Sequence, residues 1–256
     1  MSPSPPTLDA WLRQGPFTLA LSAGFFGFFA HCGMLEALLE AGLVPAAVTG
    51  ASAGALVGGL WAAGLDTPAI GAELQSLRRA DFWDPWPGLG LLRGRLFRRH
   101  LERALPTRTF EACRAPFAAS VFDVLARTTR VLATGELAPA IQASCSVPVL
   151  FHPTFIGRRP YVDGGVRDRP ALAGIEPGVR VLSHYLVPHD PRDRERTPPA
   201  RPGLVALVLR DLPRVHPFGL AAGPVALAVA RDATRRALSL PLAPVLTLNA
   251  GGARAV

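Results

Sequence analysis

The serine at position 52 lies in a motif that is typical of nucleophilic catalysis, Gly50-Ala51-Ser52-Ala53-Gly54. In a G-x-S-x-G turn between a strand and a helix, the serine hydroxyl is exposed, and the flanking Gly50 and Gly54 allow close approach of neighbouring elements. The helix N-terminus favours the negative charge that develops on a reacting carbonyl. A chance match is expected roughly 0.1 times at this composition. The elements around the motif therefore decide its interpretation.

A nucleophilic serine needs a base, and Asp163 is the candidate that the sequence singles out. Asp163-Gly164-Gly165 follows an apolar strand end and opens a turn. Its chance expectation is also roughly 0.1. A buried carboxylate with a raised pKa can accept the serine proton directly if it lies within hydrogen-bond reach. The alternative is an ordinary turn in which the aspartate bonds its own backbone.

Histidine is the more usual base, and the chain has six histidines. A Ser–His–Asp triad of the α/β-hydrolase type would take its histidine from late in the chain, which leaves His184, His189 and His216 as candidates. His31 lies on a mostly apolar helix, which favours a structural role with satisfied hydrogen bonds.

The elements that would position Ser52 and Asp163 alternate between strands and helices. Strands are predicted at 18–22 and 44–49, and helices at 28–40 and 53–63, from apolar spacing and glycine stops. This order is typical of a parallel sheet with helices packed on it. Later predictions are helices at 67–79, 95–105, 137–145 and 224–240, strands at 117–124, 129–132 and 204–209, an aromatic loop at 82–90 and a polar, proline- and arginine-rich loop at 188–202.

Residues 17–172, about two-thirds of the chain, resemble the patatin-like phospholipases. Besides the serine and aspartate motifs, the resemblance rests on two further stretches. One is Ala30-His31-Cys32-Gly33, which lies in the helix predicted at 28–40, and the other is Ala143-Ser144-Cys145-Ser146-Val147-Pro148. It implies a three-layer α/β/α fold with a central, mostly parallel sheet. It also implies a Ser52–Asp163 dyad without a catalytic histidine, a covalent acyl-enzyme, and hydrolysis of phospholipid or other lipid esters with no metal or cofactor.

The segment that would form the oxyanion hole departs from the family pattern. The family usually carries a glycine run with an arginine, whereas this chain has Ala23-Gly24-Phe25-Phe26-Gly27-Phe28. Gly24 aligns with a family glycine, Gly27 falls at the arginine, and Phe25 and Phe28 fall at glycines. Oxyanion donors are backbone amides, so we assign Gly24, Phe25, Phe26 and Ala53 to this role.

Phenylalanine disfavours a positive φ, so this loop either takes a different path or makes a weakened site. We favour a working loop whose phenylalanines line the acyl site, with at least two of the four aromatics at 25–29 packed in the core. A weakened hole would instead make the chain a catalytically impaired relative that binds a membrane or a protein partner. The basic helix at 95–105 and the aromatic loop at 82–90 would supply the surface for this, although we favour a solvated helix face as the explanation of the arginines.

Composition limits the other classes of function. Hydrophobic residues make up 49% and charged residues 18%, which excludes a disordered chain. The net charge of +8 results from 27 arginines against 19 acidic residues, with no lysine. We attribute this arginine content to coding bias rather than to nucleic-acid binding. A mild attraction to anionic membranes still follows from the charge. Three widely spaced cysteines and the absence of a signal sequence or an apolar span predict an intracellular protein without disulfides. One domain is predicted over 1–256, with 173–256 as its C-terminal part.

Overall fold

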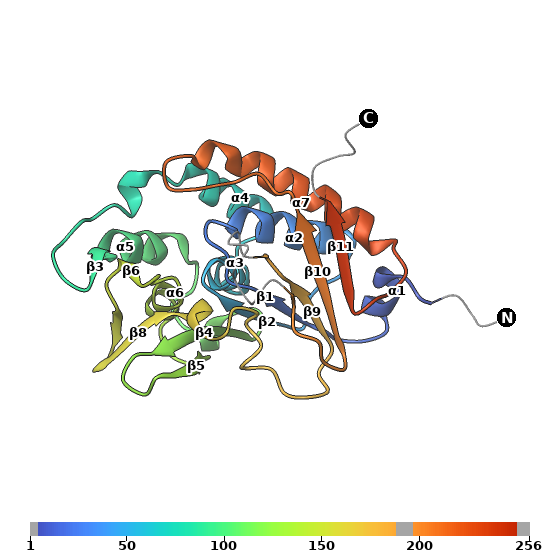
Figure 1. The fold of residues 1–256 in the computed structure, drawn as a ribbon, viewed down its shortest axis with the longest axis horizontal. Helices are drawn as coiled ribbons and strands as arrows, with labels where there is room; N and C mark the ends of the chain where they lie inside the picture. Colours follow the sequence, from blue (N-terminus) through green and yellow to red (C-terminus); the bar gives the residue numbers. More distant parts are fainter. Residues whose placement is uncertain (1–4, 188–196, 250–256) are drawn as a thin grey trace.

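The computed structural model describes residues 5–187 and 197–249 and has an α/β fold around one large sheet (Figure 1). The nine strands follow the order β11-β10-β9-β1-β2-β4-β8-β7, with β5 paired to β4. Every neighbouring pair from β11 to β4 is parallel, and the pairs that join β4, β5, β7 and β8 are antiparallel. The predicted α/β class with a central, mostly parallel sheet is confirmed.

The strands and helices have the following bounds. The sheet consists of β1 (Thr18–Leu21), β2 (Ala47–Ala51), β4 (Phe117–Asp123), β5 (Thr128–Leu132), β7 (Thr154–Ile156), β8 (Arg159–Asp163), β9 (Val181–His184), β10 (Leu204–Arg210) and β11 (Val245–Asn249), and β3 (Gly90–Leu92) pairs separately with β6 (Val149–Phe151). The helices are α1 (Leu8–Arg13), α2 (Phe28–Glu40), α3 (Ala53–Ala62), α4 (Thr67–Ser76), α5 (Arg95–Ala104), α6 (Leu137–Ser144) and α7 (Gly223–Leu238).

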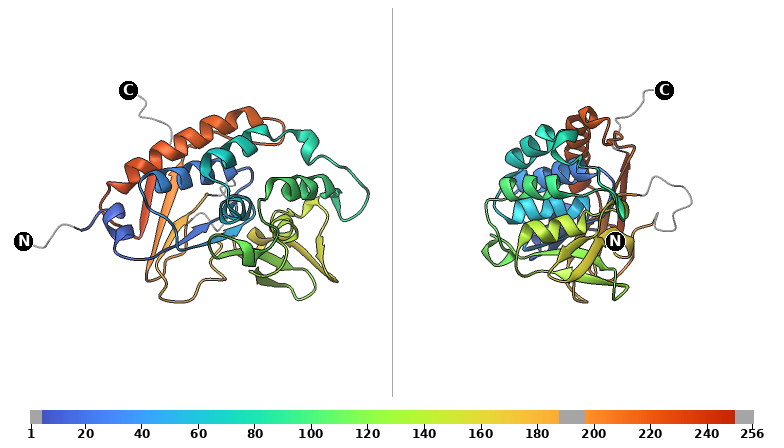
Figure 2. Two further views of the ribbon diagram at one scale, coloured as in Figure 1. Left: turned by 180° about the vertical axis from the view of Figure 1, so that it is seen from behind. Right: turned by 90° about the vertical axis from the view of Figure 1, so that its left-hand side faces the viewer.

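The helices gather on one face of the central strands (Figure 2). α3 lies against β1, β2 and β4, while α7 packs on α2 and on β10 and β11. A Cβ at Gly33 of α2 would overlap the carbonyl oxygen of Leu227 in α7, so only glycine allows these two helices to lie this close. On the other face, the apolar side chains of β1, β9 and β10 pack against the irregular segment 171–179, chiefly at Ile175. The layers over this part of the sheet are therefore helices, sheet and the segment 171–179.

Several predicted elements differ from the structure. The second strand lies at Ala47–Ala51 rather than 44–49, because its register is set by parallel pairing of Ala47 with Thr18. The helix predicted at 67–79 ends at Ser76, and a short 3-10 turn follows at Arg79–Asp81. Part of the loop predicted at 188–202 lies outside the described residues. No helix among those described is long and apolar enough to cross a membrane.

Residues after 172, which could not be assigned beyond a strand, a helix and a loop, complete the fold. β9, β10 and β11 extend the parallel sheet beyond β1, and α7 covers them (Figure 1). Because β9 pairs with β1 in parallel, the C-terminal part of the chain supplies the support for the loop that follows β1. β1, which precedes α2, is thereby held from both sides, by β2 and by β9.

Candidate active site

Ser52 occupies a sharp turn between β2 and α3. Its φ of +53° and ψ of −119° form a conformation that non-glycine residues rarely adopt and that stores about 1–3 kcal/mol of strain. Its amide donates to Oγ of Ser144 at 2.9 Å. A Cβ at Gly50 would lie 2.5 Å from the amide nitrogen of Ala55, and a Cβ at Gly54 would overlap the carbonyl oxygen of Leu21. Glycine is therefore required at both motif positions for α3 to begin directly above the strands.

Strand β4 brings Asp163 next to Ser52. Residues Phe117–Ser120 of β4 pair with β2, and the following residues of β4 pair with β8 along the same edge. Ala51 is opposite Ser120, and Asp163 is opposite Val121, the next residue. The end of β2 and the end of β8 therefore meet on one strand, although 111 positions separate Ser52 from Asp163 in the sequence (163 − 52).

The two glycines after Asp163 allow this turn to pack closely. A Cβ at Gly164 would overlap the carbonyl oxygen of Ser120, and a Cβ at Gly165 would lie 2.6 Å from Cβ of Ala23. Gly165 also donates its amide to Oδ1 of Asp163 at 2.7 Å. The self-bonded turn that was the alternative interpretation of this motif is therefore present, but it engages only one of the two carboxylate oxygens.

The side chain of Asp163 also interacts with that of Ser52. The side chain is buried, and no partner within the described residues satisfies Oδ2. Burial raises the pKa of Asp163 to about 6; hydrogen bonding from the Ser52 hydroxyl and the Gly165 amide, and the charge of Arg169, each lower it. A buried carboxylate with a raised pKa beside a serine hydroxyl is able to accept its proton.

The loop at Gly24–Gly27 leaves several backbone amides free. Within the described part of the chain, the amides of Gly24, Phe25, Phe26 and Ala53 donate no hydrogen bond. Phe26 adopts a φ of +55°, so this loop does place a phenylalanine in the left-handed region. All four residues line the same pocket as Ser52. Free amides beside a candidate nucleophile are what an oxyanion hole requires.

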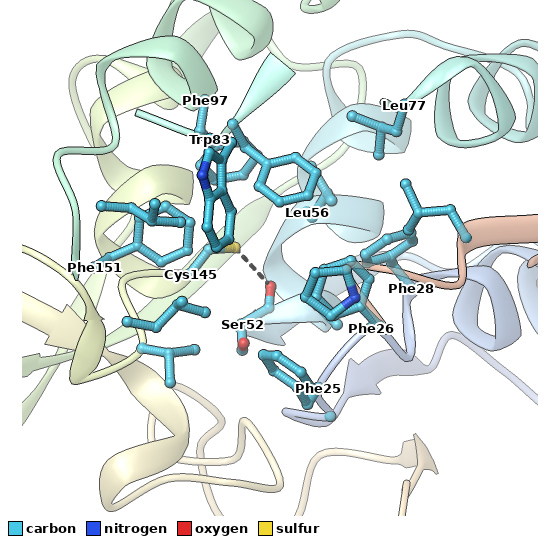
Figure 3. Close-up of a pocket in the computed structure, with 18 residues that line it drawn as sticks. Phe25, Phe26, Phe28, Ser52, Leu56, Leu77, Trp83, Phe97, Cys145 and Phe151 are labelled. Carbon is cyan, nitrogen blue, oxygen red and sulfur yellow. Dashed lines mark hydrogen bonds between the residues drawn. The ribbon is translucent and has the colours of Figure 1, made fainter. Parts of the chain in front are cut away.

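An almost wholly apolar pocket opens over Ser52 (Figure 3). Phe25 and Phe26 lie on one side of the serine, with Cys145 and Phe151 on the other. The remaining walls come from segments distant in sequence: Phe28, Leu56, Leu77, Phe82, Trp83, Leu92, Phe97, Val147, Leu150, Pro217 and Leu220. Of the four aromatics at 25–29, Phe28 and Phe29 are buried in the core, as expected, and Phe25 is exposed at the pocket.

Cys145 touches the serine residue itself. Its thiol donates to the backbone carbonyl of Ser52 at 3.2 Å, and desolvation together with the charge of Asp163 raises the pKa of that thiol well above its usual value. The thiol therefore stays protonated and acts as a donor rather than as a nucleophile. All three cysteines are free. No three ligand-type side chains gather into a metal site within the described residues.

Two of the three histidines proposed as alternative bases have hydrogen-bond partners other than Ser52. His184 is fully buried and pairs with His31, whose Nδ1 lies 2.9 Å from Nδ1 of His184. His216 accepts the amide of Phe218, and His189 lies outside the described residues. Among the described residues, neither His184 nor His216 contacts Ser52. The hydrogen bonds of His31 agree with the expected structural role.

Sequence reasoning missed Arg169. Its Nη1 donates to the carbonyl oxygen of Ala23 at 3.2 Å, and its own carbonyl accepts the amide of Ala23 at 2.7 Å. It thereby ties the turn after Asp163 to the start of the Gly24–Gly27 loop. No pattern in the sequence marks this residue, because the two segments meet only through the sheet.

Known proteins resemble this chain mainly over the part that holds the site. A family model described as "Patatin-like phospholipase" matches residues 19–174. An uncharacterised NTE family protein of Mycobacterium tuberculosis is 32% identical over 177 residues, which is 68% of this chain and 49% of that protein. A lysophospholipase of Cryptococcus neoformans is 28% identical over 63% of this chain and 10% of its own length. The chain thus spans about half the length of the mycobacterial relative and about a tenth of the length of the fungal lysophospholipase.

A solved structure shares the fold. VipD from Legionella pneumophila superposes with a TM-score of 0.54 at 17% identity, over 76% of this chain and 50% of that one. At this identity the likeness concerns the arrangement of strands and helices alone. The fold expected from the sequence motifs is thus found in an independently solved protein.

Proposed function

Because this chain belongs to the patatin-like phospholipase family, we propose that it hydrolyses carboxylic esters of lipids with Ser52 as nucleophile and Asp163 as base. The observation that carries the proposal is the meeting of a strained serine with a buried carboxylate whose pKa is raised to about 6. A carboxylate with that pKa is mostly ionised at pH 7 and still basic enough to accept a proton in the transition state.

Acylation begins when Oγ of Ser52 attacks the ester carbonyl carbon and Oδ2 of Asp163 takes the hydroxyl proton. The carbonyl electron pair moves to oxygen, where the free amides of Gly24, Phe25, Phe26 and Ala53 are the available donors. When the intermediate collapses, the bond to the alcohol breaks and the leaving oxygen takes the proton from Asp163. The acyl group is left as an ester of Ser52.

Deacylation reverses the roles with water. Asp163 accepts a proton from water as its oxygen bonds to the acyl carbon, and the same amides stabilise the second oxyanion. Collapse breaks the bond to Oγ, and the proton returns from Asp163 to Ser52. The fatty acid is released and the dyad is regenerated. Every step uses groups of this chain and water.

The pocket supports a lipid as the acyl donor. Apart from Ser52, its lining consists of apolar and aromatic side chains, the Cys145 thiol and the Trp83 indole. Burying an acyl chain there gains about 0.8 kcal/mol for each methylene removed from water. Because Ser52 lines the same pocket, an ester carbonyl at the end of the bound acyl chain can lie beside the serine hydroxyl.

We also propose that the pocket opens toward an anionic membrane surface. Arg79 stacks on both Trp83 and Phe218, and Arg93 stacks on Trp86. Arginine beside exposed aromatics suits the headgroup region, where the rings enter the apolar boundary and the cations face phosphates. The proposed membrane-contact surface also has four exposed apolar residues, Trp86, Leu89, Leu91 and Phe218.

Hydrolysis is tested with purified protein and two lipids, a lysophosphatidylcholine and a phosphatidylcholine, by measuring released fatty acid. The parent protein is expected to release acid, and Ser52→Ala and Asp163→Asn are expected to release none above background. Ser76→Ala and Asp232→Asn change exposed residues of the same types and should behave as the parent does. Loss of activity in these controls, or full activity in Ser52→Ala, contradicts the dyad.

Membrane contact is tested separately on Ser52→Ala protein, which does not degrade the vesicles. Phosphatidylcholine vesicles that contain phosphatidylserine should bind it, and the combined change Trp86→Ala with Leu89→Asp should abolish binding. Leu125→Asp, at an exposed apolar residue of the β4–β5 turn, serves as the matched control. Equal binding by all three proteins would remove this surface from the proposal. Binding by a parent that hydrolyses no ester would support the impaired-relative alternative.

A further inference from the structure

Two fully buried histidines lie beneath the loop that carries the free amides. His31 belongs to the first turn of α2 and His184 ends β9. Their Nδ1 atoms are 2.9 Å apart, and their rings are nearly perpendicular at 88°. Nε2 of His31 lies 2.8 Å from the carbonyl oxygen of Ser22. The proposed dyad does not use either ring.

The hydrogen-bond network assigns the protons of this pair. The Ser22 carbonyl can only accept, so Nε2 of His31 carries the hydrogen. In a neutral ring Nδ1 of His31 is then an acceptor, and Nδ1 of His184 must donate to it. Burial lowers the pKa of His31 to about 4, and burial together with His31 lowers the pKa of His184 well below its usual value. Both rings are therefore neutral at pH 7, and the direction of each bond is fixed.

Every polar group of Ser22 forms a hydrogen bond with His31, His184 or Leu186. Its amide donates to the carbonyl of His184 at 3.2 Å, its carbonyl accepts from His31, and its hydroxyl accepts the amide of Leu186 at 2.8 Å. The next residue, Ala23, is held by two bonds to Arg169. The chain is thus fixed through Ala23, and the free amides start at Gly24.

Leu186 supports the same loop by packing. A Cβ at Gly24 would lie 2.5 Å from Cδ1 of Leu186, and a Cβ at Gly27 would overlap that atom. The space that side chains would need at both positions is therefore filled by one leucine from the segment after β9.

We propose that His31 and His184 are positioning residues that hold the amides of Gly24–Phe26 in place beside Ser52. This inference rests on the proposed function, because it gives these amides the task of stabilising the oxyanion. The pair touches no substrate and acts through Ser22. Its loss should loosen the loop while the dyad and the pocket walls outside the loop remain.

The test compares two substitutions of His184. Asparagine places an amide N–H at the position of Nδ1, so His184→Asn retains the donor to His31; His184→Leu removes it and leaves Nδ1 of His31 buried without a partner. Hydrogen–deuterium exchange of peptides that cover residues 22–28 reports on the loop directly. Values of kcat and KM for a short-chain fatty acyl ester report on the reaction.

In His184→Leu, exchange in 22–28 should be faster than in the parent, and kcat should fall by roughly 10- to 100-fold because misplaced donors stabilise the oxyanion less. KM should stay within about threefold, since most of the pocket wall comes from segments outside the loop. His184→Asn should restore both readouts to near the parent values. Leu246→Ala, which removes buried side-chain atoms from β11, is the control for general destabilisation and should change neither the exchange of 22–28 nor kcat.

Parent-like exchange and kcat in His184→Leu, or the same changes in His184→Asn or Leu246→Ala, would overturn the proposal. If His184→Leu does not fold, His184→Gln replaces it, because the glutamine amide reaches the position of Nε2 and not of Nδ1. A parent that hydrolyses no ester would refute the proposed function. The exchange comparison would then decide the positioning role alone, through protection that His184→Asn keeps and His184→Leu loses.

Discussion

Replacing Asp163 with asparagine should stabilise the protein while it removes the base. Burial raises the pKa of this carboxyl from 3.8 to about 6, which means that the ionised form is disfavoured in the folded state. The difference of about 2.2 corresponds to about 3 kcal/mol at neutral pH. The side chain introduced by Asp163→Asn would still accept the Gly165 amide through its Oδ1, and its Nδ2 would replace the buried, unpartnered Oδ2.

The sign of this effect depends on pH in a defined way. A raised folded-state pKa means that the folded protein binds a proton before the unfolded chain does, so the parent gains stability as the pH falls from about 6 toward 3.8. The advantage of Asp163→Asn should therefore be about 3 kcal/mol at pH 7.5 and about half of that at pH 5. His31 titrates in the opposite sense, because burial lowers its pKa to about 4. Only the difference between the two proteins isolates Asp163, since both contain the same histidines.

Urea unfolding of the parent and of Asp163→Asn at pH 7.5 and pH 5, at one ionic strength, measures this difference. The variant should unfold at higher urea at pH 7.5, and the gap should narrow at pH 5. Equal or lower stability of the variant at pH 7.5 would refute the reasoning, as would a gap that does not change with pH. Stabilisation together with loss of activity is the expected mark of a group kept for chemistry at the expense of the fold.

Three further outcomes follow from the site. The rate of acylation should rise with pH through about 6, because only ionised Asp163 accepts the proton, and at pH 5 it should be about a tenth of its plateau, measured by single-turnover kinetics. Gly27→Ala should cost about 1–3 kcal/mol in thermal or urea unfolding, and Leu186→Ala in the same chain should recover part of it; additive losses would contradict the packing described. Gly54→Ala should destabilise by at least about 3 kcal/mol, because its Cβ meets the backbone of Leu21 and no side chain can move aside; a normal melting temperature would disprove this contact.

The turns that carry Ser52 and Asp163 were predictable because each is specified by a short motif. The turn at Ser52 and the turn at Asp163 each combine glycines with one functional residue, and α2 occupies the predicted bounds of 28–40. Their meeting follows from β4, whose edge pairs with β2 and then with β8. Strand pairing of this kind depends on the whole sheet, so the sequence supported proximity only through family resemblance.

The supporting contacts could not be predicted. His31 and His184 are 153 positions apart (184 − 31) and meet because β9 pairs with β1, which a single sequence does not reveal. Arg169 and Leu186 act on the loop for the same reason. Positive φ at Phe26 is contrary to residue preference and is imposed by its surroundings. The assignment of one domain to residues 1–256 and the catalytic roles of the site residues stay predictions.

The most direct test of the central claim is labelling with a fluorophosphonate, which reacts with an activated serine whatever its substrate. The probe would be applied to the parent, to Ser52→Ala and to Asp163→Asn, each shown to be folded by circular dichroism. Labelling of the parent that is absent in both variants is the result we predict. A folded parent that is not labelled, or a label that persists in Ser52→Ala, would contradict a reactive Ser52–Asp163 pair.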